Sequence, residues 1–251
     1  LRRSSAASDV YKRQSYFFTS ESVSEGHPDK VADQISDSLL DNFLFQDCES
    51  KVACETLVTT GLTVLSGEVK TNSYVDVQEV ARDTIRKIGY TKSEYKFDAD
   101  SCGVISAIHE QSSDIRQGVV EGEGLHKEQG AGDQGMMFGY ATNETTNFIP
   151  LELDLSHQIL VELAQIRKTN EEMLYLRPDS KSQVTIEYSD DHIPLKISSI
   201  VISTQHDEFD TEENMLSRIK DDILNILMPR VIEKQSDKNK KLFGEEKYHI
   251  N

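Results

Sequence analysis

The order of predicted helices and strands repeats along this 251-residue chain, and this repetition constrains the fold more than any other feature. Helix, strand, strand, helix and strand are predicted for residues 28–46, 52–65, 69–77, 78–88 and 101–109. After a glycine-rich interval the same order returns at residues 151–168, 183–188, 195–204, 213–233 and 247–250. The repeat is one of topology rather than of residues. It predicts an α+β fold of related repeats, each a β-sheet with helices packed on one face.

Local signals support these elements. Apolar residues recur with helical spacing at Val31, Ile35, Leu39 and Phe43, and Pro28 suits the first turn of that helix. We expect Gly67 to form the turn between the first two long strands. A short strand is predicted at residues 16–18, and a helix break near Pro229.

The chain divides into four parts. Residues 1–14 carry four basic residues and one acidic residue, in contrast to the acidic remainder. An organelle transit peptide would have such a composition, but a leader not native to the protein is the preferred interpretation. Residues 15–116 are predicted as an N-terminal repeat and residues 117–130 as a mobile gating loop or linker. Residues 131–251 are predicted as a central repeat, truncated at its last strand.

Composition favours a soluble, cytoplasmic protein. Hydrophobic residues make up 37% of the chain, and no apolar run approaches the length of a membrane span. The formal charge of −17 argues against a nucleic-acid partner. An acidic protein that binds a polyphosphate needs divalent cations or a local cluster of basic residues. The three cysteines show no metal-binding spacing and are expected to be reduced, buried thiols.

The segment Glu25-Gly26-His27-Pro28-Asp29-Lys30 precedes the first helix. Unpaired N–H groups at a helix start favour anions, His27 can donate to a phosphate oxygen, and Asp29 can hold a divalent cation. This pattern suggests a nucleotide phosphate site. The plainer interpretation is that Asp29 caps the helix while His27 bonds to the loop. Further along the helix, acidic residues recur at every fourth position, at Asp33, Asp37 and Asp41, and this spacing indicates a solvated helix face.

Other candidates are weaker alone. Glu55 lies in a predicted strand, where it either needs a cation or hydrogen-bond donor or lies on a solvated sheet face. Glu68 follows the predicted turn glycine. Asp133 lies in a glycine-rich stretch that is either a tight turn beside a ligand or a plain connector. Lys181 could neutralise a phosphate and Asp179 could accept from a ribose or bind a metal, or both belong to an ordinary turn.

Together these motifs resemble one family. The motifs are Ser-Glu-Gly-His27-Pro-Asp29-Lys, Ala-Cys-Glu55-Thr, Gly-Ala-Gly-Asp133-Gln-Gly, Phe-Gly-Tyr-Ala-Thr-Asn-Glu at 138–144 and Arg-Pro-Asp179-Ser-Lys181-Ser. In this order they resemble S-adenosylmethionine synthetase (methionine adenosyltransferase), with the bacterial branch most similar. The resemblance runs from about Tyr16 to Asn251.

The resemblance implies an enzyme that joins ATP to L-methionine. The methionine sulfur displaces the whole triphosphate, which is then hydrolysed to pyrophosphate and phosphate. It implies Mg²⁺ and K⁺ as cofactors and a dimer or dimer of dimers. The implied roles are His27 as catalytic and ATP-binding residue, Asp179 and Lys181 in ATP binding, Glu68 and Gln111 in methionine binding, Asp133 in a substrate-side loop, Asp29 for magnesium and Glu55 for potassium.

The chain departs from the family in two places. Arg116 and Val120 stand where bacterial members usually have Asn and Asp, which affects closure of the gating loop. Family members also continue past Asn251 into a third repeat, so we expect the chain alone to have little or no synthetase activity. Two alternatives are a metal-dependent phosphohydrolase and a catalytically inactive fragment or regulatory subunit.

Overall fold

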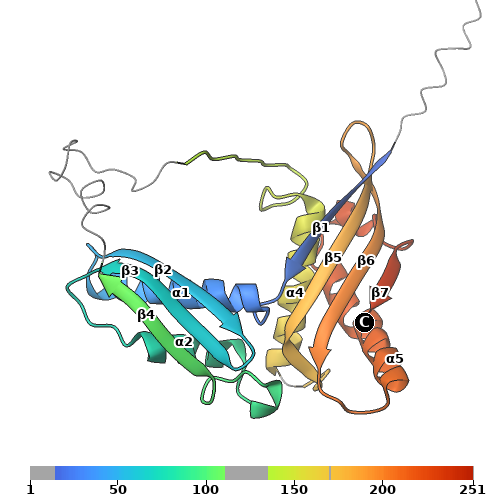
Figure 1. Ribbon diagram of the computed structural model, residues 1–251. Helices are drawn as coiled ribbons and strands as arrows, with labels where there is room; N and C mark the ends of the chain where they lie inside the picture. The colour runs from blue at the N-terminus through green and yellow to red at the C-terminus, as the bar shows by residue number, and fades with distance from the viewer. Residues whose placement is uncertain (1–14, 111–134, 170, 251) are drawn as a thin grey trace, which may run out of the picture. The chain divides into compact units, whose positions relative to one another are not determined.

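The computed structural model describes residues 15–110, 135–169 and 171–250 (Figure 1). Contacts divide these residues into two compact units. One unit lies between Glu25 and Tyr140 and is called the three-stranded unit here. The other combines the residues before Glu25 with those after Tyr140 and is called the four-stranded unit. Within the parts of the chain that the structure describes, no helix has both the length and the apolar character needed to cross a membrane.

The three-stranded unit is a sheet with two helices on one face (Figure 1). Strands β2 (Lys51–Thr59) and β3 (Leu62–Lys70) are antiparallel, and β4 (Gly103–Glu110) runs parallel to β3. The helices are α1 (Pro28–Gln46) and α2 (Val77–Ile88), and a short 3₁₀ turn, η2, covers Ser93–Tyr95. The buried face of α1 is the predicted one, formed by Val31, Ile35, Leu39 and Phe43. The helix boundaries of α1 are also as predicted.

The hairpin of this unit turns six residues earlier than predicted. The chain reverses between Thr59 and Leu62, and Gly67 lies inside β3 opposite Cys54. Gly67 has φ +130°, and a Cβ atom there would lie 1.9 Å from the carbonyl oxygen of Ala53. The glycine is needed because the neighbouring strand passes too closely for any side chain. Consequently Glu68 is a strand residue rather than a turn residue.

The four-stranded unit has the sheet order β1-β5-β6-β7. Its strands are β1 (Tyr16–Val23), β5 (Leu176–Tyr188), β6 (Pro194–His206) and β7 (Lys247–Ile250). Its helices are α4 (Leu151–Thr169), α5 (Glu212–Asp222), the π-helical segment η3 (Ile223–Leu227), α6 (Met228–Glu233) and α7 (Asp237–Lys240). Strands β5 and β6 form an antiparallel hairpin and β7 runs parallel to β6, as β4 does to β3. The predicted repetition of an α+β topology is therefore confirmed.

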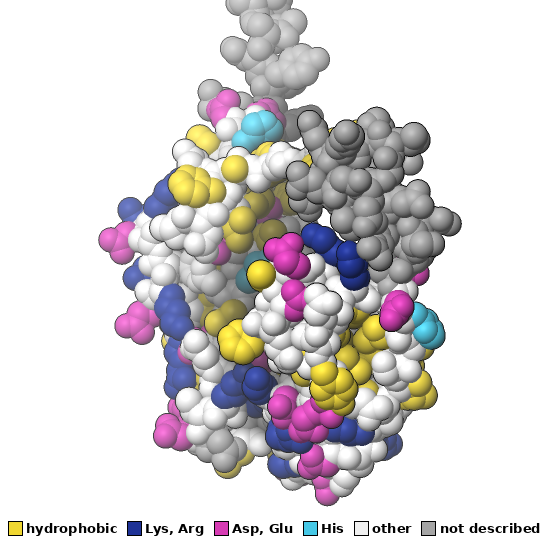
Figure 2. Space-filling model, turned by 90° about the vertical axis from the view of Figure 1, so that its left-hand side faces the viewer, with side chains coloured by type: hydrophobic (Ala, Val, Ile, Leu, Met, Phe, Trp, Pro, Cys, Tyr) yellow, Lys and Arg dark blue, Asp and Glu magenta, His cyan; other side chains and the backbone are white. Residues whose placement is uncertain are grey.

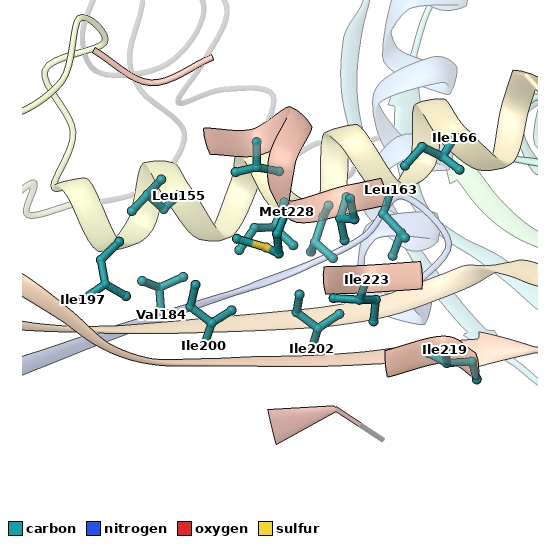
Figure 3. Close-up of a cluster of buried hydrophobic side chains, with 14 of the residues drawn as sticks. Leu155, Leu163, Ile166, Val184, Ile197, Ile200, Ile202, Ile219, Ile223 and Met228 are labelled. Atoms are coloured by element: carbon teal, nitrogen blue, oxygen red, sulfur yellow. The ribbon is translucent and has the colours of Figure 1, made fainter. Parts of the chain in front are cut away.

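The core of the four-stranded unit lies between its sheet and its helices (Figure 3). Leu155, Leu163 and Ile166 line the helix side of this core along α4, and Val184 and Ile200 line its sheet side. The remaining labelled members of this cluster are Ile197, Ile202, Ile219, Ile223 and Met228. Alternation along β5, with every second residue from Leu176 to Tyr188 buried, shows that one sheet face is covered and the other is open. The open face carries polar residues of β5.

Strand β1 belongs to this second sheet. It was predicted as a three-residue strand within the N-terminal repeat, 15–116, but all eight of its residues pair with β5. The two strands are antiparallel, from Tyr16 opposite Tyr188 to Val23 opposite Lys181. This pairing joins residues more than 150 positions apart in the sequence, so no local sequence pattern predicts it.

The last long helix is interrupted near Pro229, as predicted, and the interruption lies just before the proline. A five-residue π-helical segment, Ile223–Leu227, separates α5 from α6, and Pro229 lies in the first turn of α6. Proline lacks an N–H group and its ring crowds the preceding turn of an α-helix. A wider π turn accommodates that crowding, so the helical path continues instead of ending.

Candidate functional site

The segment that precedes α1 is anchored at Ser24, the last residue of the N-terminal part of the four-stranded unit. Its hydroxyl donates to the carbonyl oxygen of Pro178 and accepts from the N–H of Ser180, both at 2.8 Å. The N–H of Ser24 donates to the carbonyl oxygen of Ser180 at 2.9 Å. These bonds extend the β1–β5 pairing to within three residues of His27 along the chain.

His27 is the residue that caps helix α1. Its Nδ1 accepts a hydrogen bond from the N–H of Asp29 at 3.2 Å, and its carbonyl oxygen accepts from the N–H of Val31 at 2.9 Å. The plainer interpretation, that Asp29 is the cap, is therefore wrong. Because Nδ1 is the acceptor, the neutral ring carries its proton on Nε2. That N–H is the donor that His27 can offer to a ligand.

Asp29 lies in the first turn of α1 and extends into solvent. Its side chain is 88% exposed, and its carboxylate comes within 3.8 Å of His27 Nδ1. A solvent-exposed carboxylate supplies hard oxygen ligands, which suit Mg²⁺. Along the same helix Asp33, Asp37 and Asp41 are exposed, as predicted for a solvated acidic face.

Two side chains outside the predicted set hold this loop in place. The buried Tyr90 donates its hydroxyl proton to the carbonyl oxygen of Gly26 at 2.5 Å. Gln34 of α1 donates from Nε2 to the carbonyl oxygens of Glu25 and Lys30, at 2.8 and 2.9 Å. Neither contact has a local sequence signal, since Tyr90 is 64 residues from Gly26.

Glu55 and Glu68 lie on the sheet face that the helices of their unit leave open. Glu55 is opposite Ser66, while Glu68 is opposite Ala53 on one side and His109 on the other. Glu55 is exposed and Glu68 is half-buried. Within its own unit, Glu55 therefore occupies a solvated face and does not point into the core.

The cysteines differ from the expectation of three buried thiols. All three are free, but only Cys102 is buried, while Cys54 is intermediate and Cys48 is exposed. Burial raises the pKa of the Cys54 thiol, and the nearby charge of Glu55 adds to that effect. Burial also raises the pKa of Cys102. Both thiols therefore stay protonated at neutral pH and are poor metal ligands.

The motif Arg177–Ser182 was predicted as a turn before a strand, but it lies within β5. Extended backbone places alternate side chains on opposite faces, so Arg177, Asp179 and Lys181 share the open face. Arg177 forms an ion pair with Asp207, with 2.6 Å between Nε and Oδ1. Lys181 is exposed and Asp179 is half-buried. The motif thus presents charges of alternating sign in a row, which a turn would not do.

The segment 138–144 leads into α4 through Glu144. Glu144 accepts from the N–H of Leu151 and from the hydroxyl of Tyr188, both at 3.0 Å. Tyr188 also lies 2.6 Å from the buried carboxylate of Glu152. Burial, followed by the hydrogen bonds and charges of the two carboxylates, raises the pKa of Tyr188. Tyr188 therefore remains a protonated donor between two acids.

Four predicted positions lie outside the described residues: Gln111, Asp133, Arg116 and Val120. The predicted gating loop at 117–130 lies there as well. Among the residues that the structure does describe, no group of three or more His, Cys, Asp or Glu side chains is arranged to hold a metal. The face drawn in Figure 2 intersperses acidic, basic and hydrophobic side chains.

Residues 15–113 match the family model described as S-adenosylmethionine synthetase, N-terminal domain, and residues 128–251 match its central domain. The chain is 67% identical over 237 residues to the S-adenosylmethionine synthase of Flavobacterium johnsoniae, covering 94% of this chain and 56% of that protein. It is 66% identical over 238 residues to that of Christiangramia forsetii, with the same coverage.

A third relative, the S-adenosylmethionine synthase of Parabacteroides distasonis, is 62% identical over 248 residues, covering 94% of this chain and 58% of that protein. Two consecutive domains of one family account for most of the chain, so its class is that of a protein with N-terminal and central synthetase domains. The chain belongs to the S-adenosylmethionine synthetase family. It spans a little over half the length of the curated relatives it matches.

Proposed function

We propose that the protein containing this chain synthesises S-adenosylmethionine from ATP and L-methionine. The observation that carries this proposal is the 62–67% identity to three proteins named S-adenosylmethionine synthase, sustained over 94% of the chain. In the proposed reaction the methionine sulfur attacks C5′ of ATP and the triphosphate leaves. The triphosphate is then hydrolysed to pyrophosphate and phosphate.

The chemistry of the described residues is consistent with this reaction. A thioether sulfur is nucleophilic without deprotonation, so the residues need to orient the reactants and stabilise the leaving polyanion rather than supply a base. The N–H on Nε2 of His27 is suited to a triphosphate oxygen. On the open face of its own sheet, the exposed Lys181 offers a positive charge to ATP and Asp179 offers an acceptor.

Methionine is proposed to contact Glu68 and Gln111. Glu68 is opposite His109 of β4, and Gln111 follows directly after Glu110, the last residue of that strand. The half-buried carboxylate of Glu68 suits the amino group of methionine. Asp133, in the glycine-rich stretch, is proposed to belong to the substrate-side loop.

Two cations are proposed as cofactors. When bound, Mg²⁺ would neutralise developing charge on the phosphates, and K⁺ would support the geometry of the site. Asp29 fits Mg²⁺ because its carboxylate is 88% exposed and lies beside the His27 ring. Glu55 is proposed for K⁺, because its exposed carboxylate belongs to the open sheet face. Divalent cations would also reconcile a formal charge of −17 with a polyphosphate substrate.

The proposal extends to assembly and location. We infer a homo-oligomer, a dimer or dimer of dimers, in the cytoplasm, with no nucleic-acid or membrane partner. The acidic composition supports the exclusion of nucleic acid. The oligomer is measurable by analytical ultracentrifugation of the same protein used for the activity assay.

The decisive experiment transfers residues 15–251 into the Flavobacterium johnsoniae relative in place of the segment they match. With ATP, methionine, Mg²⁺ and K⁺, the hybrid is expected to form S-adenosylmethionine, detected by mass spectrometry. Its His27→Ala variant, folded to the same extent by circular dichroism, is expected to lose at least 100-fold in turnover. The matched control is Asp37→Asn, which changes an exposed residue of the same helix.

Two results would contradict the proposal. One is phosphate release from ATP that is independent of methionine and yields no S-adenosylmethionine, which would indicate a phosphohydrolase. The other is a folded hybrid that binds no ATP–Mg²⁺, which would indicate a regulatory part. The chain on its own, assayed alongside, is expected to show little or no turnover because the relatives contain substantial further sequence beyond the match.

A further inference from the structure

The loop that carries His27 has a support of its own in the three-stranded unit. The N-cap bond of His27 is made by a side chain on a short irregular segment, residues 24–27, between β1 and α1. Such a segment holds one conformation only if its backbone groups are fixed. The bond between Tyr90 and Gly26 fixes the carbonyl that immediately precedes His27.

Tyr90 is itself held rigidly. Its ring packs edge-on against Phe97 with centroids 5.2 Å apart and against Tyr95 with centroids 6.3 Å apart. Its backbone N–H donates to the carbonyl oxygen of Ile85, and its carbonyl oxygen accepts from the N–H of Ala99. The ring is buried, and its hydroxyl lies 2.5 Å from the Gly26 oxygen. A rigid donor of this kind specifies where the acceptor must lie.

Gln34 approaches the same loop from α1. Its amide bonds the carbonyl oxygens of Glu25 and Lys30, so it ties the residue before Gly26 to the first turn of the helix. Tyr90 and Gln34 therefore restrain two consecutive peptide groups, and His27 follows directly. Both contacts are made within the three-stranded unit.

We propose that Tyr90, assisted by Gln34, is a positioning residue that sets the orientation of the His27 ring for the leaving triphosphate. This inference rests on the proposed function for its catalytic consequence. Its structural part, the control of the His27 ring by Tyr90, stands independently. Loss of the Tyr90 hydroxyl leaves the ring packing intact but frees the Gly26 carbonyl. The His27 cap then exchanges between bonded and open forms.

The first test needs no activity. In the 251-residue chain labelled with ¹⁵N-histidine, long-range ¹H–¹⁵N spectra at a pH where His27 is neutral report which ring nitrogen carries the proton. The Nε2–H form is expected to dominate, and Tyr90→Phe is expected to produce a mixture of the two tautomers. Tyr95→Phe is the matched control, because it removes a hydroxyl from the same aromatic cluster without touching the bond to Gly26. An unchanged tautomer in Tyr90→Phe would overturn the inference.

The second test uses the hybrid enzyme. Tyr90→Phe is expected to lower kcat for S-adenosylmethionine formation about tenfold, and Tyr95→Phe by less than twofold. If Tyr90 acts through His27, adding Tyr90→Phe to His27→Ala produces less than a twofold further loss. A purely structural loss multiplies with the His27 effect, so a full tenfold further loss in the double variant would refute the positioning role.

A third variant keeps the inference testable if Tyr90→Phe unfolds. Gln34 lies on the partly exposed surface of α1, and Gln34→Leu removes its bond to the loop carbonyl of Glu25 together with its bond to Lys30 in the first turn of the helix. This variant is expected to shift the His27 tautomer in the same direction. No tautomer shift in this folded variant would count against the inference. Failure of the proposed function is distinguishable, because a hybrid with all native residues would then form no S-adenosylmethionine while the tautomer result stands.

Discussion

Gly67 makes the strongest quantitative prediction, because an alanine there has no room. Its φ of +130° lies in a region that side chains rarely adopt, and the added Cβ would lie 1.9 Å from the Ala53 oxygen. The backbone strain costs about 1–3 kcal/mol. Forcing β2 away from β3 adds about 1–3 kcal/mol as an overpacking cost. Gly67→Ala is therefore expected to destabilise the three-stranded unit by about 2–6 kcal/mol.

Gly61→Ala is the matched control. Gly61 lies at the hairpin turn with φ +70°, and the nearest atom to a Cβ there is the Lys96 oxygen at 3.8 Å. This variant carries a backbone penalty of about 1–2 kcal/mol and no clash. Because both variants carry a backbone penalty, the predicted difference between them is the overpacking cost alone, about 1–3 kcal/mol, and it isolates the close approach of the two strands.

Urea unfolding measures the difference. The chain contains no tryptophan, so far-ultraviolet circular dichroism is the appropriate signal. Hydrogen–deuterium exchange with mass spectrometry locates the loss of stability. Peptides of β2 and β3 are expected to exchange faster, while peptides of the four-stranded unit keep their protection from exchange. Equal destabilisation by Gly67→Ala and Gly61→Ala would refute the argument, because it would mean that β2 accommodates a methyl group at no cost.

Three further predictions concern hydrogen bonds of buried groups, each measured by the shift of the urea midpoint. The pKa of Asp98 lies below its ordinary value of 3.8, chiefly through the hydroxyl of Ser101, with help from backbone N–H groups. The folded form therefore stays ionised where the unfolded chain takes up a proton. That stabilisation is present above pH 3.8 and is lost as the pH falls through the lower folded pKa. Asp98→Asn is expected to lower the free energy of unfolding at pH 7 and to make its decrease at acidic pH less steep. An equally steep decrease in the variant would contradict this prediction. Ser24→Ala removes the hydroxyl that donates to and accepts from the backbone of β5, and it is expected to lower the free energy of unfolding by about 2–3 kcal/mol. A loss under about 0.5 kcal/mol would argue against the anchoring role of Ser24. Tyr188→Phe deprives the buried carboxylate of Glu152 of a donor and is expected to cost about 1–3 kcal/mol, with Tyr140→Phe on an exposed residue as the control.

The sequence located much of the candidate site because its signals are local. Proline, histidine and aspartate before an apolar helical repeat predicted the start of α1, and the structure confirms both the helix and its buried face. The capping role was assigned to the wrong side chain. Asp29 has the more common capping chemistry, but His27 is the residue whose backbone is extended, with φ −65° and ψ 140°. Capping depends on backbone geometry as well as residue type.

Other parts of the site were predicted wrongly or not at all, because their sequence signals are not local. The motif at 177–182 contains proline, aspartate and serines, which are typical of turns, so it was predicted as one. In the structure it lies within the central strand β5, which pairs with β1 on one side and with β6 on the other from Ser180 and Lys181 onward. Tyr90 and Gln34 were not predicted at all, because a side chain that donates a hydrogen bond to a backbone carbonyl leaves no pattern in composition or spacing.

The amino-acid sequence by itself determined the repeated helix–strand order, the start and buried face of α1, and the motifs shared with one family. These features depend on neighbours within a few residues, through helical periodicity, capping and turn chemistry. Only the tertiary structure decided that β1 pairs in the sheet of the four-stranded unit and that the backbone of the paired strand β2 leaves no room for a side chain at Gly67. It also decided that Tyr90 reaches Gly26 across 64 residues. Such contacts form when distant segments compete for the same hydrogen bonds and packing space, and that competition is resolved only in three dimensions.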